Sequence, residues 1–271
     1  MFKRLLGLVV FAAFVPVSAL AATPGTWVPA GHLLYAGFHS APLATAGKDG
    51  LIYSMGSDFE AYNPATRKSA GLPHPPLSAS GFCLVTGVAG KIHALGSLIA
   101  AYSPTKGTWI MEAYPPALVF DPTCAVGANG LLYVFDAGKA DYRYDPYANT
   151  WTTLASTPPN DAGPAVLGPD GNIYIVGCAL YAYHPITDSW TAGAPMDTCP
   201  ESATIGPDGR LYADIWGSTV MEVYDFATAS WSRMAGPPNY GKLATAAGHL
   251  YSLGGTNAKT GRFGTQVFKQ T

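Results

Sequence analysis

Charged residues are scarce in this sequence, and their scarcity limits what the protein can bind. Only 12% of the 271 residues are charged, with 15 Lys and Arg against 17 Asp and Glu, so the formal net charge is −2. No basic stripe with interleaved aromatic residues is present, although such a stripe is the usual electrostatic mark of a nucleic-acid surface. The sequence therefore predicts no nucleic-acid partner.

Short motifs that mark several enzyme classes are also missing. The chain has no nucleophile elbow, no phosphate-cradling glycine loop and no zinc-protease helix. Its four cysteines form no C-x-x-C pair, so we expect no metal site and no cofactor. Asn-x-Ser/Thr acceptor sites are absent too, which favours a bacterial origin for an exported chain.

Only one long hydrophobic run occurs, and it lies at the N-terminus. Lys3 and Arg4 precede the apolar stretch 5–15, and the small-residue site 19–21 follows it. This order is typical of a secretory signal peptide, whereas Pro16 and the short length argue against a membrane anchor. We expect residues 1–21 to be removed and the protein to be periplasmic or secreted, with no membrane span after cleavage.

Glycine-centred turns recur about every forty residues, which indicates a repeat protein. Each glycine is followed by a triplet that ends in Tyr, or once in His, and each triplet suits a strand after a tight hairpin turn. The glycines are Gly50, Gly90, Gly130, Gly171, Gly209 and Gly248.

A second marker repeats with the same phase. In four units a tyrosine stands seven residues before a tryptophan, with turn-forming polar residues between them. The pairs are Tyr102 and Trp109, Tyr144 and Trp151, Tyr183 and Trp190, and Tyr224 and Trp231. Each unit thus contains four short strands, so the sequence predicts an all-β propeller of six four-stranded antiparallel blades.

The combined hairpin and Tyr-x-Pro-x-x-x-x-Trp turns, as in YDPYANTW, resemble those of kelch-repeat β-propellers over nearly everything after residue 25. The resemblance implies a six-bladed ring with a ligand face. This chain departs from the kelch pattern because only Gly254-Gly255 supplies the usual double glycine, and because Ser69 replaces the first tryptophan. The GPDG turns at Gly168 and Gly206 are also similar to those of lyase-like and lactonase-like propellers.

The two chain ends predict how the ring closes. The last unit stops after 266–268, before any tryptophan strand, while Trp27 belongs to a strand without a blade of its own. We therefore expect the segment around Trp27 to pair with the C-terminal strands, which removes open sheet edges. Residues 22–271 then form a single domain, for which we expect a monomer.

Export makes disulfides the first interpretation of the cysteines. Cys178 and Cys199 fall on the same face of the ring, so we predict that they pair. Cys83 and Cys124 lie on the innermost strands of adjacent blades, but their positions in those strands differ by one. Their side chains could face each other across the blade boundary or point apart, and a Cys83–Cys124 disulfide is predicted with that alternative open.

Loops that pass from one blade to the next share a face with the loops between second and third strands. Four charged residues near the starts of innermost strands could surround the channel on this face: Asp121, Asp161, Glu201 and Lys242. We expect Glu201 and Lys242 to hold equivalent positions in adjacent blades. These charges form either a rim salt bridge or a polar site for a sugar or small acid.

Two aromatic residues on the same face lie outside the repeat pattern. Trp216 and Tyr240 could stack on sugar rings or on a peptide, or they could simply pack. The function predicted is a non-catalytic exported propeller that binds a glycan or a protein surface through this face. The alternative is an enzyme of the sugar mutarotase, isomerase or lyase type that uses the acidic residues near the channel.

Overall fold

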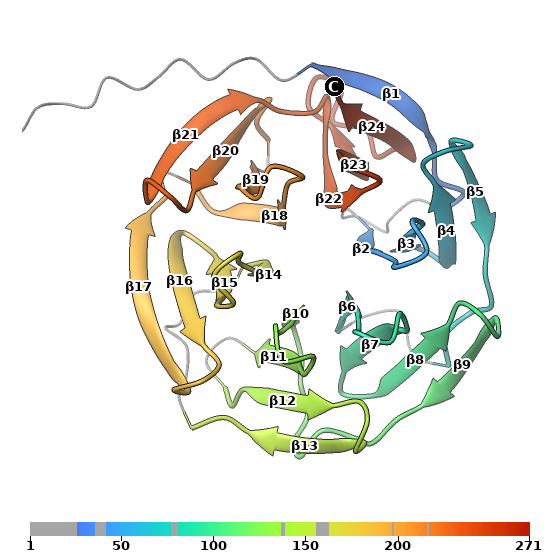
Figure 1. Cartoon of the computed structure of the whole chain (residues 1–271). Helices are drawn as coiled ribbons and strands as arrows, with labels where there is room; N and C mark the ends of the chain where they lie inside the picture. Colours follow the sequence, from blue (N-terminus) through green and yellow to red (C-terminus); the bar gives the residue numbers. More distant parts are fainter. Residues whose placement is uncertain are drawn as a thin grey trace, which may run out of the picture.

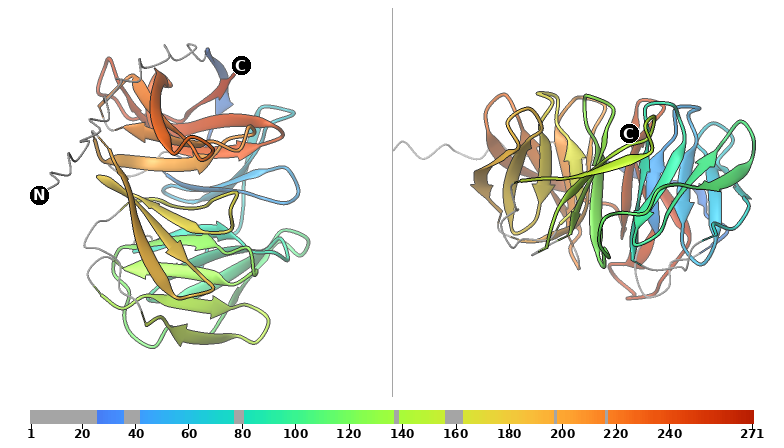
Figure 2. Two further views of the ribbon diagram at one scale, coloured as in Figure 1. Left: turned by 60° about the vertical axis from the view of Figure 1, so that its left-hand side comes forward. Right: turned by 90° about the horizontal axis from the view of Figure 1, so that it is seen from below.

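A computed structural model shows a ring of six blades around a central axis (Figure 1). It describes residues 26–35, 42–76, 81–136, 139–155, 163–196, 198–215 and 217–271. The predicted signal peptide at 1–21 lies outside the described residues. In the side view, the blades stand next to one another around the axis and their turns lie at the two faces of the ring (Figure 2).

Each of the six sheets has four antiparallel strands, ordered from the axis outward. The first two blades contain β2 (Leu43–Ala46), β3 (Ile52–Met55), β4 (Phe59–Asn63) and β5 (Lys68–Gly71), then β6 (Phe82–Thr86), β7 (Ile92–Gly96), β8 (Ile99–Ser103) and β9 (Thr108–Met111). The next two contain β10 (Pro122–Val126), β11 (Leu132–Asp136), β12 (Tyr142–Asp145) and β13 (Thr150–Thr153), then β14 (Ala165–Leu167), β15 (Ile173–Val176), β16 (Ala179–His184) and β17 (Ser189–Pro195).

The fifth blade contains β18 (Pro200–Ile205), β19 (Leu211–Ile215), β20 (Val220–Asp225) and β21 (Ser230–Ala235). The sixth contains β22 (Asn239–Ala246), β23 (His249–Asn257), β24 (Gln266–Gln270) and β1 (Trp27–His32). Strand β1 pairs antiparallel with β24, with Trp27 opposite Gln270. The predicted closure of the ring by the N-terminal strand is therefore confirmed.

In four of the six glycine turns, an acidic or amide residue organises the turn. In the first blade the Asp49 carboxylate accepts the Leu51 N–H at 3.2 Å and the Tyr53 hydroxyl at 2.6 Å. Gly50, between them, has a φ of 82°, which a side chain would strain. Asp170 and Asp208 accept the hydroxyl of their triplet tyrosine in the same way, whereas the Asn129 amide donates to its tyrosine hydroxyl. The repeated triplet is thus the visible part of a turn that fixes the hairpin register.

The Tyr and Trp markers pair directly across the third and outermost strands. Tyr144 lies opposite Trp151, and their ring centroids are 4.8 Å apart. The Trp151 indole N–H donates to the carbonyl oxygen of Ala113 in the preceding blade at 2.7 Å. Trp109 makes the equivalent bond to Pro73 at 2.8 Å. Each of these tryptophans therefore ties its blade to the one before it, as well as filling the space between them.

Candidate functional site

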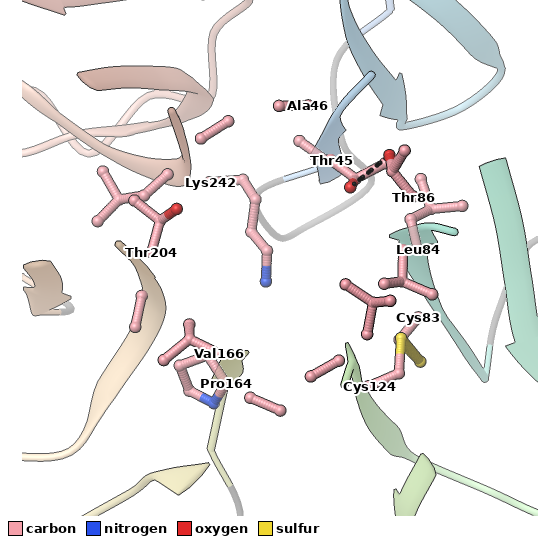
Figure 3. Close-up of a pocket in the computed structure, with 18 of the residues that line it drawn as sticks. Thr45, Ala46, Cys83, Leu84, Thr86, Cys124, Pro164, Val166, Thr204 and Lys242 are labelled. Carbon is pink, nitrogen blue, oxygen red and sulfur yellow. Dashed lines mark hydrogen bonds between the residues drawn. A yellow bond between two sulfur atoms is a disulfide. The ribbon is translucent and has the colours of Figure 1, made fainter. Parts of the chain in front are cut away.

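A cavity of about 350 Å³ lies on the ring axis (Figure 3). All six innermost strands, β2, β6, β10, β14, β18 and β22, contribute to its wall, together with Pro164, which directly precedes β14. Most of the lining side chains are alanine, valine, leucine, isoleucine and threonine. Among the described lining residues, Lys242 is the only one that carries charge. The surface of the cavity is therefore part apolar and part polar, and it holds a single ammonium group.

Hydroxyl groups on the wall bond mainly across blade boundaries. Thr45 and Thr86 share a hydrogen bond of 3.0 Å between the first two blades. The Thr245 hydroxyl donates to the Ile205 carbonyl oxygen at 2.6 Å between the last two. The Thr123 hydroxyl accepts the N–H of Ala165 at 2.9 Å. These threonines hold the inner strands together, so their polar groups already have partners in the protein.

Both predicted disulfides are present. Cys83 on β6 bonds to Cys124 on β10, with their Cα atoms 5.9 Å apart, so the two side chains face each other across the blade boundary. This disulfide forms part of the cavity wall. Cys178, between β15 and β16, bonds to Cys199, just before β18. The first disulfide therefore links two innermost strands, and the second links the fourth blade to the fifth.

Lys242 projects from β22 into the cavity (Figure 3). The residue is partly exposed, but the surface that it exposes faces the cavity, so protein surrounds the ammonium. Burial lowers the pKa of Lys242, and attraction to Glu201 opposes this shift. Within the described part of the chain, its ammonium makes no hydrogen bond or ion pair.

Two carboxyl groups lie near Lys242 in the fifth blade. Glu201 on β18 is exposed as a residue, yet burial of its carboxyl group raises its pKa, while Lys242 acts to lower it. Asp214 on β19 is 1% exposed and accepts the Gly241 N–H at 3.2 Å. Burial, together with repulsion from Glu201, raises the pKa of Asp214 well above its usual value. The axis end of the fifth and sixth blades thus holds one cation and two acids.

The expected equivalence of Glu201 and Lys242 is wrong by one residue. Lys242 lies opposite Leu253, two residues beyond the triplet tyrosine Tyr251. The corresponding position in the fifth blade, opposite Asp214, is Ser202. Both innermost strands contain a register irregularity just before this position, between Pro200 and Ser202 and between Tyr240 and Lys242. Because the irregularity has the same place in both strands, Glu201 corresponds to Gly241, one residue before Lys242.

Two of the other predicted ligand residues lie within the described part of the chain. Asp121 is exposed just before β10, and its N–H lies 3.5 Å from a carboxylate oxygen of Asp136. Tyr240 is partly buried on β22, opposite Thr256. Asp161 and Trp216 lie outside the described residues. Of the three charged candidates within the described ranges, the structure brings only Glu201 and Lys242 into electrostatic contact, and they do not form the salt bridge that the sequence left open.

A buried acid pair in the third blade was not predicted. Asp136 ends β11 and Asp141 precedes β12, and they are 4% and 1% exposed. The Asp136 N–H donates to Asp141 at 3.3 Å, but burial and repulsion from Asp136 and Asp188 raise the pKa of Asp141 to about 7. The sequence signal for this buried acid pair is the stretch FDAGKADY, in which two acids stand beside aromatic residues.

The blade-crossing loop from β9 to β10 exposes apolar side chains. Tyr114, Leu118 and Phe120 are 62%, 66% and 60% exposed. The neighbouring Val119 anchors the loop through two hydrogen bonds to Ser97. Its carbonyl oxygen accepts the Ser97 hydroxyl at 2.6 Å, and its N–H donates to the Ser97 hydroxyl oxygen at 3.2 Å. Lys139 sits 3.8 Å above the Phe120 ring.

Neither a metal cluster nor a membrane-spanning helix occurs within the described ranges. No group of three or more His, Cys, Asp or Glu residues there could hold a metal ion. No helix there is long and apolar enough to cross a membrane.

Comparison with known proteins identifies the architecture. No protein-family model matches the chain, and no characterised relative matches its sequence. Among solved structures, one described as a streptogramin B lyase structure superimposes with a TM-score of 0.61 at 14% sequence identity. The match covers 91% of this chain and 97% of that one. The chain is a six-bladed β-propeller. At this level of identity, the likeness is one of fold alone.

Proposed function

We propose that this protein is an exported binding propeller that holds a small ligand on the ring axis, at the end nearest the blade-crossing loops. The observation that carries the proposal is the cavity of about 350 Å³, in which Lys242 is the one charged residue among the lining residues that the structure describes. Ligand sites are mostly apolar cavities of roughly 300–1,000 Å³ with a few convergent polar groups. The cavity is near the lower end of that range, so it suits a compact molecule.

The sequence left a glycan and a protein surface open as ligands. A stable protein partner covers roughly 800 Å² on each side, which a cavity within the ring does not offer. The exposed loop residues Tyr114, Leu118 and Phe120 offer a protein partner a contact surface, but they lie away from the charged group on the axis. We therefore place the small ligand first and keep a protein partner for the outcome in which no small ligand binds.

Export is part of the proposal and rests on two separate observations. The sequence of residues 1–21 has the order of a cleaved signal peptide. Two disulfides fit an oxidising compartment outside the cytosol. The mature protein would then begin near Ala22 and act as a monomer in the bacterial periplasm or outside the cell. Its repeats resemble kelch repeats, and the proposal does not depend on membership of that family.

An enzyme is the second candidate, and one observation favours it. Burial raises the pKa of Glu201 and lowers that of Lys242, so the difference between the two pKa values becomes smaller. Acid and base groups in active sites are tuned in this direction. The streptogramin B lyase neighbour shows that a lyase can be built on a similar ring. A mutarotase, isomerase or lyase activity at this end of the axis is therefore the alternative.

A thermal-shift screen tests the location of the ligand. The mature protein is screened against sugars, sugar acids, small carboxylic acids and neutral amides, because a ligand of the native state raises the melting temperature. Thr204 lines the cavity, so Thr204→Trp fills it, while Thr153→Trp adds the same side chain at an exposed position of β13. We expect a hit that disappears in Thr204→Trp and remains in Thr153→Trp. A shift that survives Thr204→Trp would place the ligand elsewhere.

Turnover separates the binder from the enzyme. Each hit is incubated with the wild type and with Glu201→Gln, and the compound is analysed by mass spectrometry and NMR. A binder returns the compound unchanged from both proteins. Turnover that disappears in a folded Glu201→Gln variant would establish the enzyme instead.

A further inference from the structure

We propose that the Lys242 ammonium binds the carboxylate of a small organic monoacid whose apolar body lies against the cavity wall. This inference rests on the proposed function, because it assigns a ligand class to the same cavity. The proposed ligand has one anionic group and one apolar body. Neutral sugars and multiply charged molecules should not bind at this site.

The charge of the Lys242 ammonium favours an anionic ligand. An ammonium surrounded by protein loses hydration, and that loss is offset only by an opposite charge or by hydrogen bonds. No described residue supplies Lys242 with either, and Glu201 attracts it without an ion-pair contact. A bound anion would supply this compensation. A carboxylate supplies both the negative charge and the hydrogen-bond acceptors that an ammonium requires.

The side chains of the cavity wall favour a ligand with an apolar body. A neutral sugar needs many hydrogen-bond partners, but the hydroxyls of Thr45, Thr86 and Thr245 already bond across blade boundaries. The side chains that remain around the Lys242 ammonium include Leu84 and Val166 (Figure 3). These apolar side chains gain free energy by covering apolar surface of a ligand.

The charged residues around the cavity favour a ligand with a single negative charge. The cavity has one lysine and, among its described lining residues, no arginine. Lysine acts as a point charge, whereas planar bidentate recognition of phosphate or a second carboxylate usually employs arginine. Glu201 near the same end would also repel a second negative charge. One carboxylate is therefore the charge that this site accommodates.

The experiment compares acids with neutral molecules of almost the same shape. Binding of phenylacetate and phenylacetamide, and of hexanoate and hexanamide, is measured by calorimetry at neutral pH and moderate salt. The proteins are the wild type, Lys242→Met, Lys242→Arg and Lys259→Met, which removes an exposed lysine outside the cavity. Circular dichroism and melting temperature establish that each variant is folded before binding is measured.

Charge-assisted hydrogen bonds set the expected size of the effect. We expect at least one acid to bind about tenfold or more tightly than its amide. Lys242→Met should weaken that acid about tenfold or more, Lys242→Arg should weaken it less, and Lys259→Met should leave it unchanged. Binding of the amide should be the same in wild type and Lys242→Met.

Three results would overturn the inference. If acid and amide bind equally and Lys242→Met changes neither, the cavity binds ligands without the ammonium, and only the proposed function survives. The same conclusion holds if neither acid binds while a sugar gives a shift that Thr204→Trp removes. If no acid, amide or sugar binds on the axis at all, both the inference and the proposed function are wrong.

Discussion

Trp27 and Ala235 are 208 residues apart, yet the Trp27 indole N–H donates a hydrogen bond of 3.0 Å to the Ala235 carbonyl oxygen. Trp27 begins β1, the outermost strand of the sixth blade, and Ala235 ends the outermost strand of the fifth. This bond repeats the contact that Trp109 and Trp151 make with their preceding blades. The closing strand therefore makes the same interblade bond as an ordinary outermost strand.

Trp27→Ala should weaken the closure of the ring. The variant loses an interblade hydrogen bond and aromatic packing on Val223 and neighbouring residues of the fifth blade, which we expect to cost about 2 kcal/mol of unfolding free energy. It should also aggregate more readily, because β24 becomes an accessible edge. Denaturant unfolding and light scattering measure both effects. Trp109→Ala is the matched control, since it removes the same bond away from the closure. Equal aggregation in the two variants would contradict a special role for Trp27.

The Cys83–Cys124 disulfide should contribute to both stability and ligand binding. It closes a loop of 41 residues, for which loop entropy predicts about 4 kcal/mol. Replacement of both cysteines by serine should lower the melting temperature and weaken the axis ligand, because the bond is part of the cavity wall. The Cys178 and Cys199 double serine variant should lower stability without that loss of affinity. Intact mass without reduction should show two hydrogens fewer per disulfide, and four free thiols would refute both bonds.

Asp141 should make the protein less stable as the pH rises from about 4 to about 7. Its pKa is about 7 in the folded protein and about 4 in an unfolded chain, so over this interval the folded state holds a proton that the unfolded state has released. Folding stability then falls with rising pH and levels off above pH 7. Asp141→Asn should remove much of this slope and stabilise the protein at pH 8, whereas Asp121→Asn, at an exposed carboxyl, should not. Urea unfolding across pH 4–8 measures the slope, and parallel curves for wild type and Asp141→Asn would count against burial as its cause.

Glu201 should weaken the binding of an acid, although it attracts Lys242. At neutral pH a carboxylate at this position repels an incoming carboxylate, so Glu201→Gln should tighten phenylacetate binding several-fold. The same substitution removes the attraction that raises the Lys242 pKa, which should therefore fall further. Calorimetry at neutral pH detects the first effect, and phenylacetamide serves as the neutral control. Weaker acid binding in Glu201→Gln would show that Glu201 contacts the ligand in some other way.

The repeats in the sequence predicted the ring well, because blades are built from local hairpins. Turn residues such as Asp49 and Gly50 act on their immediate neighbours, so their meaning can be read without the rest of the chain. The missing last strand and the extra Trp27 strand also predicted the closure correctly. The strand positions and the order of the blades brought Cys83 and Cys124 to the same boundary but left open whether they face each other, which the structure decides.

The site was harder to predict because it depends on details of register. The bulges before Ser202 and Lys242 have no clear signature in single residues, and they decide which side chain reaches the axis. Burial of Asp214 and Asp141 arises from blade packing rather than from their own segments. Lys242 was selected as one of four rim charges, but its isolation in the cavity became visible only when all six inner strands were placed together.

The pKa of Lys242, measured by NMR of lysine side chains with and without phenylacetate, tests the account most directly. Lys242→Arg identifies the signal. In the free protein the pKa should lie below that of an exposed lysine, and acid binding should be fully present below this value and lost as the pH rises through it. Saturation with phenylacetate should raise the pKa, because the carboxylate stabilises the charged ammonium. A Lys242 pKa that stays unchanged when the cavity is saturated would contradict the account.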